Sequence, residues 1–138
     1  MASTYEGSCL CERVRYRATG PLGLMQNCHC TDCRKAHGAA FATFVDVPRE
    51  RFEYLQGEAE LKRHRAASGA LRTFCGNCGA PLVWERGTEA GVIGLAAATL
   101  DTPPEGRPEY HIFVRSKVPW FDIQDGLPQH AVDPGAEK

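Results

Sequence analysis

Short apolar runs separated by turn residues dominate the hydrophobic pattern of the chain. Residues 41–47 (FATFVDV) are rich in aromatic and β-branched side chains and stop at Pro48, which is typical of a strand. Similar runs, with glycine or proline between them, occupy residues 52–55, 59–65, 70–74, 81–84, 91–98 and 110–114. This rhythm predicts an all-β domain.

Two hairpins are expected within this pattern. Residues 7–16 alternate small or apolar with polar side chains, which predicts a hairpin or knuckle. The Ser68-Gly69 turn predicts a second hairpin, and its return strand would deliver Cys75 at its end.

A single short helix is expected to interrupt the strands. Residues 33–37 follow Thr31 and Asp32, either of which is suited to cap a helix by accepting a backbone hydrogen bond. Gly38 then ends the segment. The predicted fold class is therefore mainly β, with one short helix.

The length of the chain indicates one compact domain. Its 138 residues lie within the usual size of a domain, and no long change in composition divides them. With 43% hydrophobic and 24% charged residues, the composition is that of an ordinary globular protein. We expect a single domain over residues 1–130 and a loose C-terminal tail over residues 131–138.

The charge balance argues against nucleic-acid and membrane partners. The chain has 16 Lys and Arg residues against 17 Asp and Glu residues, and its net charge of −1 creates no field that would recruit phosphate backbones. The basic stretch of residues 62–65 is interpreted as a solvated strand face. The N-terminus lacks a signal-peptide pattern, and no run approaches the roughly 20 apolar residues that cross a bilayer. We therefore expect a cytoplasmic protein.

Seven cysteines are the main chemical signal in the chain. Disulfides are rare in the reducing cytoplasm, and an odd number of cysteines would leave one unpaired. Metal binding explains these cysteines better. Their spacing forms three groups, which are Cys9 with Cys11, then Cys28, Cys30 and Cys33, and finally Cys75 with Cys78.

The two outlying pairs together supply the four soft ligands of a closed, structural zinc site. Pairs so distant in sequence would also hold together the strands that carry them. Next to the second pair, Gly76, Asn77 and Gly79 tolerate the tight backbone that lets amide groups point at thiolate sulfur. We assign this site to Cys9, Cys11, Cys75 and Cys78.

The central triplet, Cys28, Cys30 and Cys33, supplies three thiolates within six residues. Zinc usually takes four ligands, so one position is left for water, a substrate or a further protein ligand such as His37. This ligand count is typical of a catalytic zinc and gives two zinc ions per chain. His29 lies between two of the ligands, so its side chain is expected to point away from the metal.

Two basic residues follow the triplet directly. Zinc with three thiolates carries a net negative charge, and a fourth thiolate increases it, so nearby cations or N–H donors are needed. Arg34 and Lys35 are placed to offset this charge and to bind the carboxylates of an anionic thiol. Alternatively, both are solvated charges on a short helix.

Other uses of the same cysteines stay open at this point. One zinc with spare cysteines, or a two-zinc cluster with shared thiolates, would need the same residues. A redox role for Cys75 and Cys78 lacks the expected βαβ setting. An iron-sulfur cluster usually takes four thiolates. A site of the cytidine-deaminase type requires an H-x-E element, which the sequence does not contain.

The motifs of the chain form a recognisable set. They are Gly7-Ser8-Cys9-Leu10-Cys11 with Val14 and Tyr16, Cys28-His29-Cys30-Thr31-Asp32-Cys33-Arg34-Lys35, Phe74-Cys75-Gly76-Asn77-Cys78-Gly79, and His111-Ile112 followed by Trp120 and Leu127-Pro128. The set resembles the glutathione-dependent formaldehyde-activating enzymes, which include S-(hydroxymethyl)glutathione synthase and centromere protein V. The resemblance covers most of the chain.

This resemblance implies a β-tent fold of zinc-bound antiparallel sheets, similar to type B methionine sulfoxide reductases and the Rab accessory factor. It implies a structural zinc on the outlying pairs and a catalytic zinc on the triplet. His111 lies in matching sequence, and we expect it either to bind substrate in the pocket or to be a hydrogen-bonded core histidine. The chain departs from the family pattern at Glu12, commonly glycine, and at Ala80, commonly threonine or serine, which affects local packing.

The implied function is that of a zinc-dependent carbon-sulfur lyase. Its substrate would be a thiol adduct such as S-(hydroxymethyl)glutathione, formed from glutathione and formaldehyde, so the expected partner is a small-molecule thiol. The alternative is a non-catalytic, zinc-stabilised binding module. A methionine sulfoxide reductase is disfavoured, because that chemistry needs a free reactive cysteine.

Overall fold

The computed structural model describes residues 3–87 and 91–134. Within these residues the chain forms ten β-strands, one α-helix and four short 3-10 helices. The prediction of a mainly β fold with one short helix is confirmed. Among the helices of the described part, none has the length and apolar character needed to cross a membrane.

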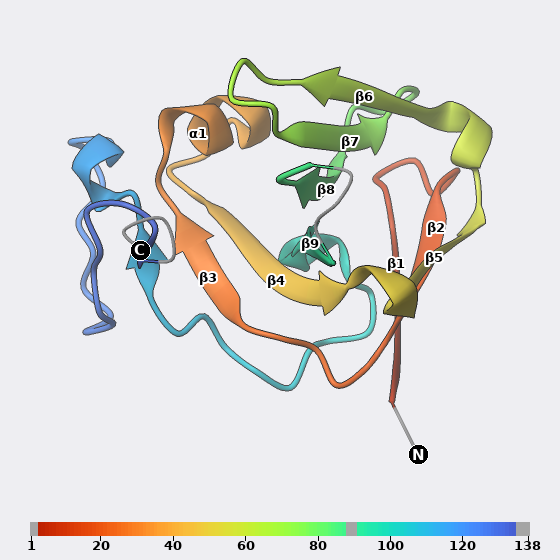
Figure 1. The fold of residues 1–138 in the computed structure, drawn as a ribbon, viewed down its shortest axis with the longest axis horizontal. Coiled ribbons are helices and arrows are strands. Elements are labelled where there is room, and N and C mark those ends of the chain that lie inside the picture. Colours follow the sequence, from red (N-terminus) through yellow and green to blue (C-terminus); the bar gives the residue numbers. More distant parts are fainter. Residues whose placement is uncertain (1–2, 88–90, 135–138) are drawn as a thin grey trace. The chain divides into compact units, whose positions relative to one another are not determined.

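The elements are short and follow one another closely, as Figure 1 shows. The strands are β1 (Thr4–Ser8), β2 (Arg15–Thr19), β3 (Met25–Cys28), β4 (Ala42–Pro48), β5 (Phe52–Gln56), β6 (Leu61–Arg65), β7 (Leu71–Cys75), β8 (Pro81–Glu85), β9 (Val92–Ala96) and β10 (His111–Ile112). The helices are α1 (Thr31–His37), η1 (Arg49–Arg51), η2 (Glu58–Glu60), η3 (Ala97–Thr99) and η4 (Val114–Ser116).

Two compact units make up the fold. Unit 1 comprises Met1–Gly23 and Val45–Glu105, and unit 2 comprises Leu24–Phe44 and Gly106–Lys138. Strand β4 therefore begins in unit 2 and ends in unit 1. The expectation of one domain over residues 1–130 stays a prediction. Residues 135–138 of the predicted tail lie outside the described residues.

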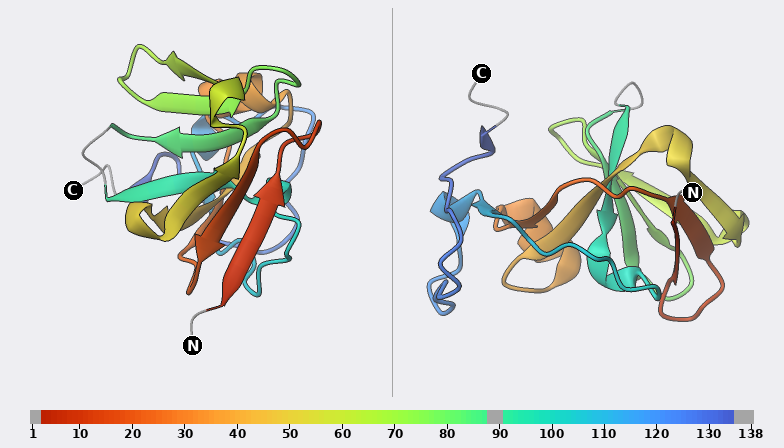
Figure 2. Two further views of the ribbon diagram at one scale, coloured as in Figure 1. Left: turned by 90° about the vertical axis from the view of Figure 1, so that its right-hand side faces the viewer. Right: turned by 90° about the horizontal axis from the view of Figure 1, so that it is seen from below.

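Unit 1 contains a three-stranded antiparallel sheet in the order β1-β2-β5. The left view of Figure 2 shows β1 and β2 side by side. Tyr16 of β2 lies opposite Gly7 of β1, and its hydroxyl group hydrogen-bonds the Thr99 side chain at 2.6 Å. Only glycine fits at position 7, because a Cβ atom there would lie 2.2 Å from the Tyr16 hydroxyl oxygen.

Strands β6 to β9 of unit 1 pair antiparallel, each with the next. The predicted hairpin at Ser68-Gly69 joins β6 to β7, and Leu61 lies opposite Cys75 at its open end. Cys75 is fully buried there. The apolar core of the unit includes side chains of β4, β8 and β9, namely Val45, Val47, Leu82, Val83, Ile93 and Leu95.

Unit 2 is built around a short parallel strand pair and the helix. Strand β3 pairs with β10, with Asn27 opposite His111 and Cys28 opposite Ile112. The buried Asn27 side chain accepts a hydrogen bond from the Thr43 hydroxyl group at 2.6 Å. Cys28 is the last residue of β3, so the pairing fixes the backbone from which the cysteine triplet begins.

The helix begins two residues earlier than predicted and has a different cap. Helix α1 starts at Thr31, and its N-cap is Cys30, whose sulfur accepts the backbone N–H of Cys33. The expectation that Thr31 or Asp32 caps the helix is wrong, because both residues lie inside its first turn. Gly38 ends the helix with a left-handed backbone (φ 60°), as the sequence predicts.

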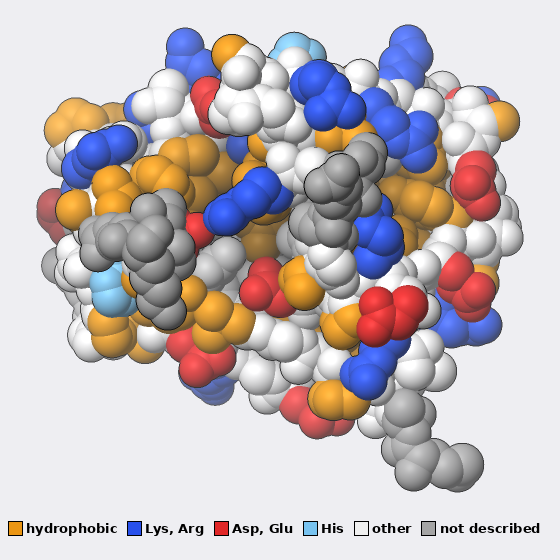
Figure 3. Space-filling view, viewed as in Figure 1, with side chains coloured by type: hydrophobic (Ala, Val, Ile, Leu, Met, Phe, Trp, Pro, Cys, Tyr) orange, Lys and Arg blue, Asp and Glu red, His pale blue; other side chains and the backbone are white. Residues whose placement is uncertain are grey.

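Charges of both signs are mixed on the face of the molecule in Figure 3, where Lys and Arg side chains lie among Asp and Glu side chains. Within unit 1, Arg17 pairs with two carboxylates and lies 3.5 Å from Glu6 and 3.3 Å from Glu53. Exposed pairs of this kind contribute little to stability. The mixture agrees with the net charge of −1.

Candidate metal centres

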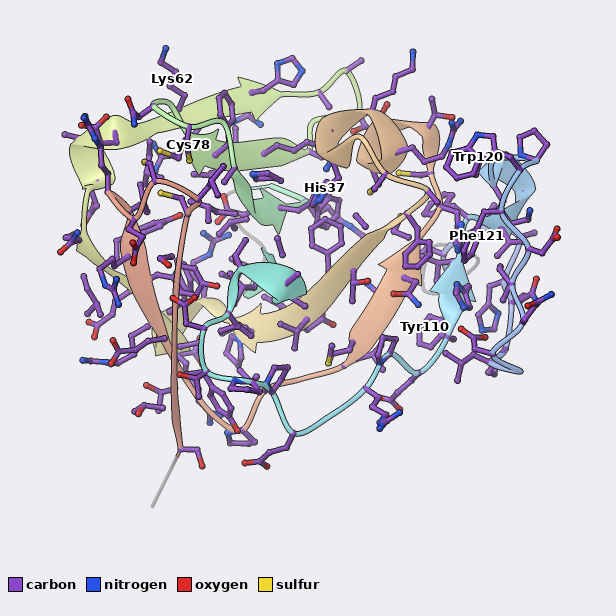
Figure 4. All side chains as sticks on the ribbon, turned by 180° about the vertical axis from the view of Figure 1, so that it is seen from behind. His37, Lys62, Cys78, Tyr110, Trp120 and Phe121 are labelled. Atoms are coloured by element: carbon purple, nitrogen blue, oxygen red, sulfur yellow. The ribbon has the colours of Figure 1, made fainter. Side chains whose placement is uncertain are left out.

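The two outlying cysteine pairs come together in unit 1. The sulfur atoms of all four residues lie within 4.8 Å of one another, and the four residues are Cys9, Cys11, Cys75 and Cys78. The Cys11 sulfur lies 3.6 Å from that of Cys9 and 3.8 Å from that of Cys75. Figure 4 shows sulfur atoms gathered around the labelled Cys78. Residues separated by more than sixty positions thus form one thiol cluster.

Each pair lies in a tight turn at the end of a strand. The first turn follows β1 and is closed by hydrogen bonds from Cys9 N–H to Val14 O and from Glu12 N–H to Cys9 O. Glu12 has a left-handed backbone there (φ 64°). The second turn follows β7, where the N–H of Gly79 bonds Cys75 O at 2.7 Å. These turns bring both cysteines of each pair to the cluster.

Backbone amides point at the sulfur atoms of this cluster, as the sequence predicts. Val14 N–H donates to the Cys9 sulfur at 3.3 Å, and Cys78 N–H donates to the Cys75 sulfur at 3.5 Å. A hydrogen bond from the Asn77 side chain is the main cause of a lowered pKa at Cys11. Such donors stabilise thiolate, the form that binds metals.

The thiols of this cluster differ in their tendency to ionise. Burial is the main cause that raises the pKa of Cys9 to about 11. At Cys78, burial also opposes ionisation, but backbone hydrogen bonds from Ala80 and Cys11 outweigh it and lower the pKa to about 6. The cluster therefore offers ready thiolates beside buried thiols, and a divalent cation would favour ionisation of all four.

The triplet forms a second cluster, in unit 2. The sulfur atoms of Cys28, Cys30 and Cys33 lie within 4.8 Å of one another, and those of Cys28 and Cys33 are 3.3 Å apart. Local structure explains this: Cys28 ends β3, Cys30 caps α1 and Cys33 lies in the first helical turn. The N–H of Cys33 donates to the Cys30 sulfur at 3.1 Å, so one sulfur both caps the helix and faces the cluster.

Three crowded thiols fit a soft cation. Cys28 and Cys33 are buried, and the pKa of Cys28 is raised well above its ordinary value, first by the neighbouring sulfurs of Cys30 and Cys33 and then by burial. A bound dication removes the charge repulsion that makes three thiolates costly. Sulfur donors select zinc and similar soft metals over magnesium or calcium. Both clusters could therefore hold a metal ion.

A hydrogen-bonded chain of side chains lies next to the triplet in sequence. His29 is fully buried, and its Nε2 lies 2.8 Å from Nδ1 of His111. The Nε2 of His111 lies 2.8 Å from an oxygen of Asp125, whose other oxygen accepts the backbone N–H of Leu127. The bond to His111 is the main cause of a lowered pKa at Asp125. Burial is the main cause that lowers the pKa of His29 to about 4.

Aromatic rings surround this histidine pair in unit 2. The ring of Phe41 packs on His29 at 4.9 Å between centroids and on His111 at 5.9 Å. Phe121 also packs on Phe41, at 5.5 Å between ring centroids. Lys117 donates to the backbone oxygen of Phe121, which holds that segment in place. Trp120, labelled beside Phe121 in Figure 4, is 73% exposed.

The predicted substrate residues lie in different environments. The guanidinium of Arg34 donates to the Thr31 hydroxyl at 3.3 Å, while its Nε is buried and has no hydrogen-bond partner among the described residues. Lys35 is exposed. His111 is buried, and both its ring nitrogens are hydrogen-bonded. The substrate role of all three residues stays a prediction.

Sequence reasoning missed the contact of Asp125 with His111 in unit 2, because no spacing signal connects this acidic loop residue to the histidine. His37 does not belong to the group of described residues that could hold a metal with the triplet; its ring packs edge-on against Phe44 at 5.5 Å.

Comparison with known proteins gives the context for these clusters. A sequence model described as "Glutathione-dependent formaldehyde-activating enzyme" matches residues 4–116. No curated protein matches the chain. A crystal structure of a Rhodobacter sphaeroides protein, a structural genomics target, is similar in fold, with 18% identity and a TM-score of 0.59 over 91% of this chain and 98% of that one. On the family match, the chain belongs to the glutathione-dependent formaldehyde-activating enzyme family.

Proposed function

We propose that the chain is a zinc-dependent enzyme that makes or cleaves the carbon–sulfur bond of a thiol–formaldehyde adduct, with glutathione as the thiol. In the forward direction the thiol sulfur bonds the carbonyl carbon of formaldehyde, the carbon–oxygen π bond breaks, and the thiol proton ends on the oxygen. The product is S-(hydroxymethyl)glutathione. The reverse reaction releases formaldehyde.

The observation that carries this proposal is the cysteine triplet in unit 2. Three sulfur atoms lie within 4.8 Å of one another, on a chain that belongs to this family. Cys28, Cys30 and Cys33 would hold the metal, and three protein ligands leave one of the usual four zinc positions for a substrate thiol. Zinc held there would supply a Lewis-acidic centre that lowers the pKa of the thiol.

The four-cysteine cluster of unit 1 supports a different role. Four protein sulfurs complete a tetrahedral zinc site, so this metal would be structural. It would hold the turn after β1 against the turn after β7. The proposal therefore includes two zinc ions per chain, and a reducing compartment such as the cytoplasm would keep the thiols available.

Two basic residues of α1 are proposed to offset the negative charge of the metal–thiolate cluster and to bind the carboxylates of the substrate. Arg34 and Lys35 follow Cys33 in the helix, and a cluster with excess thiolate charge would need such cations nearby. A guanidinium also binds carboxylates in a forked geometry, and glutathione carries two carboxylates. Lys35 is exposed and free to reach such a group.

The proposal is tested by following free formaldehyde after zinc-loaded protein is mixed with glutathione. The expected result is a loss of formaldehyde faster than in buffer, in proportion to protein concentration. Cys30→Ser should abolish the added rate and leave the fold intact, because serine is a good N-cap. Asp122→Asn, an exposed change in the loop 121–125, is the matched control and should keep the rate.

A rate equal to the uncatalysed rate at every protein concentration would exclude formaldehyde and glutathione as the substrates. If the zinc of the triplet also proved inert to added thiols in its X-ray absorption spectrum, the chain would be a zinc-stabilised binding module instead.

A further inference from the structure

The Nδ1 atom of His29 is, with the Nε atom of Arg34, one of two buried side-chain polar atoms without a hydrogen-bond partner among the described residues. The His29 side chain is fully buried. Leaving such a group unpaired costs about 1–3 kcal/mol. Native structures almost always satisfy these groups with protein, water or ligand. A partner for this nitrogen is therefore expected.

The hydrogen bonds that join Asp125, His111 and His29 determine whether Nδ1 of His29 needs a donor or an acceptor as its partner. The Asp125 carboxylate can only accept, so His111 must donate from Nε2. When the ring of His111 is neutral, its Nδ1 atom is an acceptor, and His29 donates to it from Nε2. The remaining nitrogen of His29, Nδ1, then carries a lone pair, whereas a doubly protonated His111 would reverse the bond between the rings and put a proton on Nδ1 of His29.

The described residues around His29 include aromatic rings, which offer no hydrogen-bond donor to Nδ1. Its ring packs against Phe41, at 4.9 Å between centroids, and against His111. Phe121 extends the aromatic contact beyond Phe41. The backbone N–H of His29 is already used, because it donates to Ile112 O at 2.9 Å.

We propose that the Nδ1 atom of His29 is an acceptor site for one O–H group, and that Asp125, acting through His111, is the positioning residue that fixes the tautomer required. The site lies in unit 2, on the residue between two cysteines of the triplet. Two sources can supply the O–H group: an internal water molecule, or the hydroxyl of the S-(hydroxymethyl) adduct. The second source rests on the proposed function, and the first does not.

The test is the nitrogen-15 NMR spectrum of the histidine side chains in the zinc-loaded chain. Two-bond proton–nitrogen correlations distinguish a protonated nitrogen from a bare one, and a bare nitrogen that accepts a hydrogen bond from one that does not. We expect His29 and His111 both to carry their protons on Nε2. A proton on Nδ1 of His29 would overturn the proposal, whether or not the protein is an enzyme.

The two sources give different results in the same spectrum. If water is bound, Nδ1 of His29 shows the accepting shift before any thiol is added and keeps it afterwards. If the adduct supplies the hydroxyl, the accepting shift appears with glutathione plus formaldehyde but not with S-methylglutathione, which lacks the hydroxyl. A non-accepting shift under all three conditions overturns the proposal.

The role of Asp125 is tested separately with Asp125→Leu, which removes both acceptor oxygens. The side chain of Asp125 is 44% exposed, so the change leaves the buried core unaltered. We expect a second population with the proton on Nδ1 of His29, because nothing then holds the proton of His111 on Nε2. Asp122→Leu, in the same loop, should leave the spectrum unchanged. Unaltered tautomers in Asp125→Leu would exclude its positioning role.

Discussion

Single residues set the local geometry of both cysteine clusters. In unit 2, the sulfur of Cys30 accepts the first amide bond of α1 and also belongs to the triplet. In unit 1, Glu12 takes a left-handed backbone in the turn between Cys11 and Val14. The family commonly has glycine at that position, and the backbone angle gives the physical reason.

Replacing Glu12 by glycine should therefore stabilise the protein. A side chain in the left-handed region costs about 1–2 kcal/mol, and the greater freedom of glycine in the unfolded chain cancels part of the gain, so we expect about 0.5–1 kcal/mol. The ion pair lost with Arg15 is exposed and contributes little. Urea denaturation of the zinc-loaded protein measures the change. Glu12→Ala keeps the Cβ atom and should give no stabilisation; an equal gain there would contradict the argument.

The capping role of Cys30 gives a second prediction. Serine can replace the sulfur as an acceptor at the N-cap, whereas alanine cannot, so Cys30→Ala should be less stable than Cys30→Ser by about 1 kcal/mol. Both variants lack the same cysteine sulfur, so the difference isolates the cap. Denaturation curves of the two variants, loaded with equal zinc, check this. Equal midpoints would show that the sulfur does not support the helix.

At the scale of single residues, the sequence predicted the two cysteine groups better than it predicted the hydrogen bonds around them. The spacing of the cysteines predicted both sulfur groups, because thiol clusters arise from short motifs. The cap was missed, because cysteine is not a usual N-cap residue and Thr31 and Asp32 are. Asp125 could not be connected to His111, since the two residues are fourteen positions apart and the segment that joins them carries no periodic signal.

At the scale of elements, strand packing brings the first cysteine pair into place. Gly7 of β1 lies directly against the Tyr16 ring, two residues before Cys9. We predict that Gly7→Ala destabilises the protein by about 1–3 kcal/mol, as overpacking of a filled core does. Thermal or urea unfolding measures the loss. Gly87→Ala is the control, because a Cβ there meets nothing within 4 Å. An unchanged stability for Gly7→Ala would show that β1 can shift away from β2.

The elements predicted from the apolar runs are mostly present, and the missed ones have a common reason. The aromatic run 41–47 corresponds to β4, and the turn at Ser68-Gly69 joins β6 and β7 as predicted. The predicted hairpin of residues 7–16 includes the end of β1 (Thr4–Ser8) and its pairing with β2, but the start of β1 and all of β3 (Met25–Cys28) were not foreseen. Their sequences, TYEGS and MQNC, have few β-branched residues, and pairing with β2 and β10 defines them as strands.

At the scale of the whole molecule, each compact unit contains one thiol cluster, and the two clusters differ in acidity. In unit 1 burial raises the pKa of Cys9 to about 11, but the pKa of Cys11 is lowered, mainly by Asn77, and that of Cys78 is lowered to about 6. In unit 2 the pKa of Cys28 is raised by its neighbouring sulfurs and by burial. Protons therefore compete with a metal more strongly at the triplet.

This difference predicts the order of metal release on acidification. A lowered thiol pKa means that thiolate persists as the pH falls, so the four-cysteine cluster should keep its zinc down to about pH 6 or below, while the triplet releases its zinc at higher pH. Release is followed with a chromogenic chelator during a stepped titration. In Cys30→Ser the higher-pH step should be missing. A missing lower-pH step in that variant would reverse the assignment of the two clusters.

The central claim is that two separate sulfur clusters bind zinc, and the zinc content of the purified protein tests it most directly. We predict two equivalents per chain in the unaltered protein and one in Cys30→Ser, because only the triplet loses a ligand. One equivalent or fewer in the unaltered protein, with no loss in Cys30→Ser, would contradict the account.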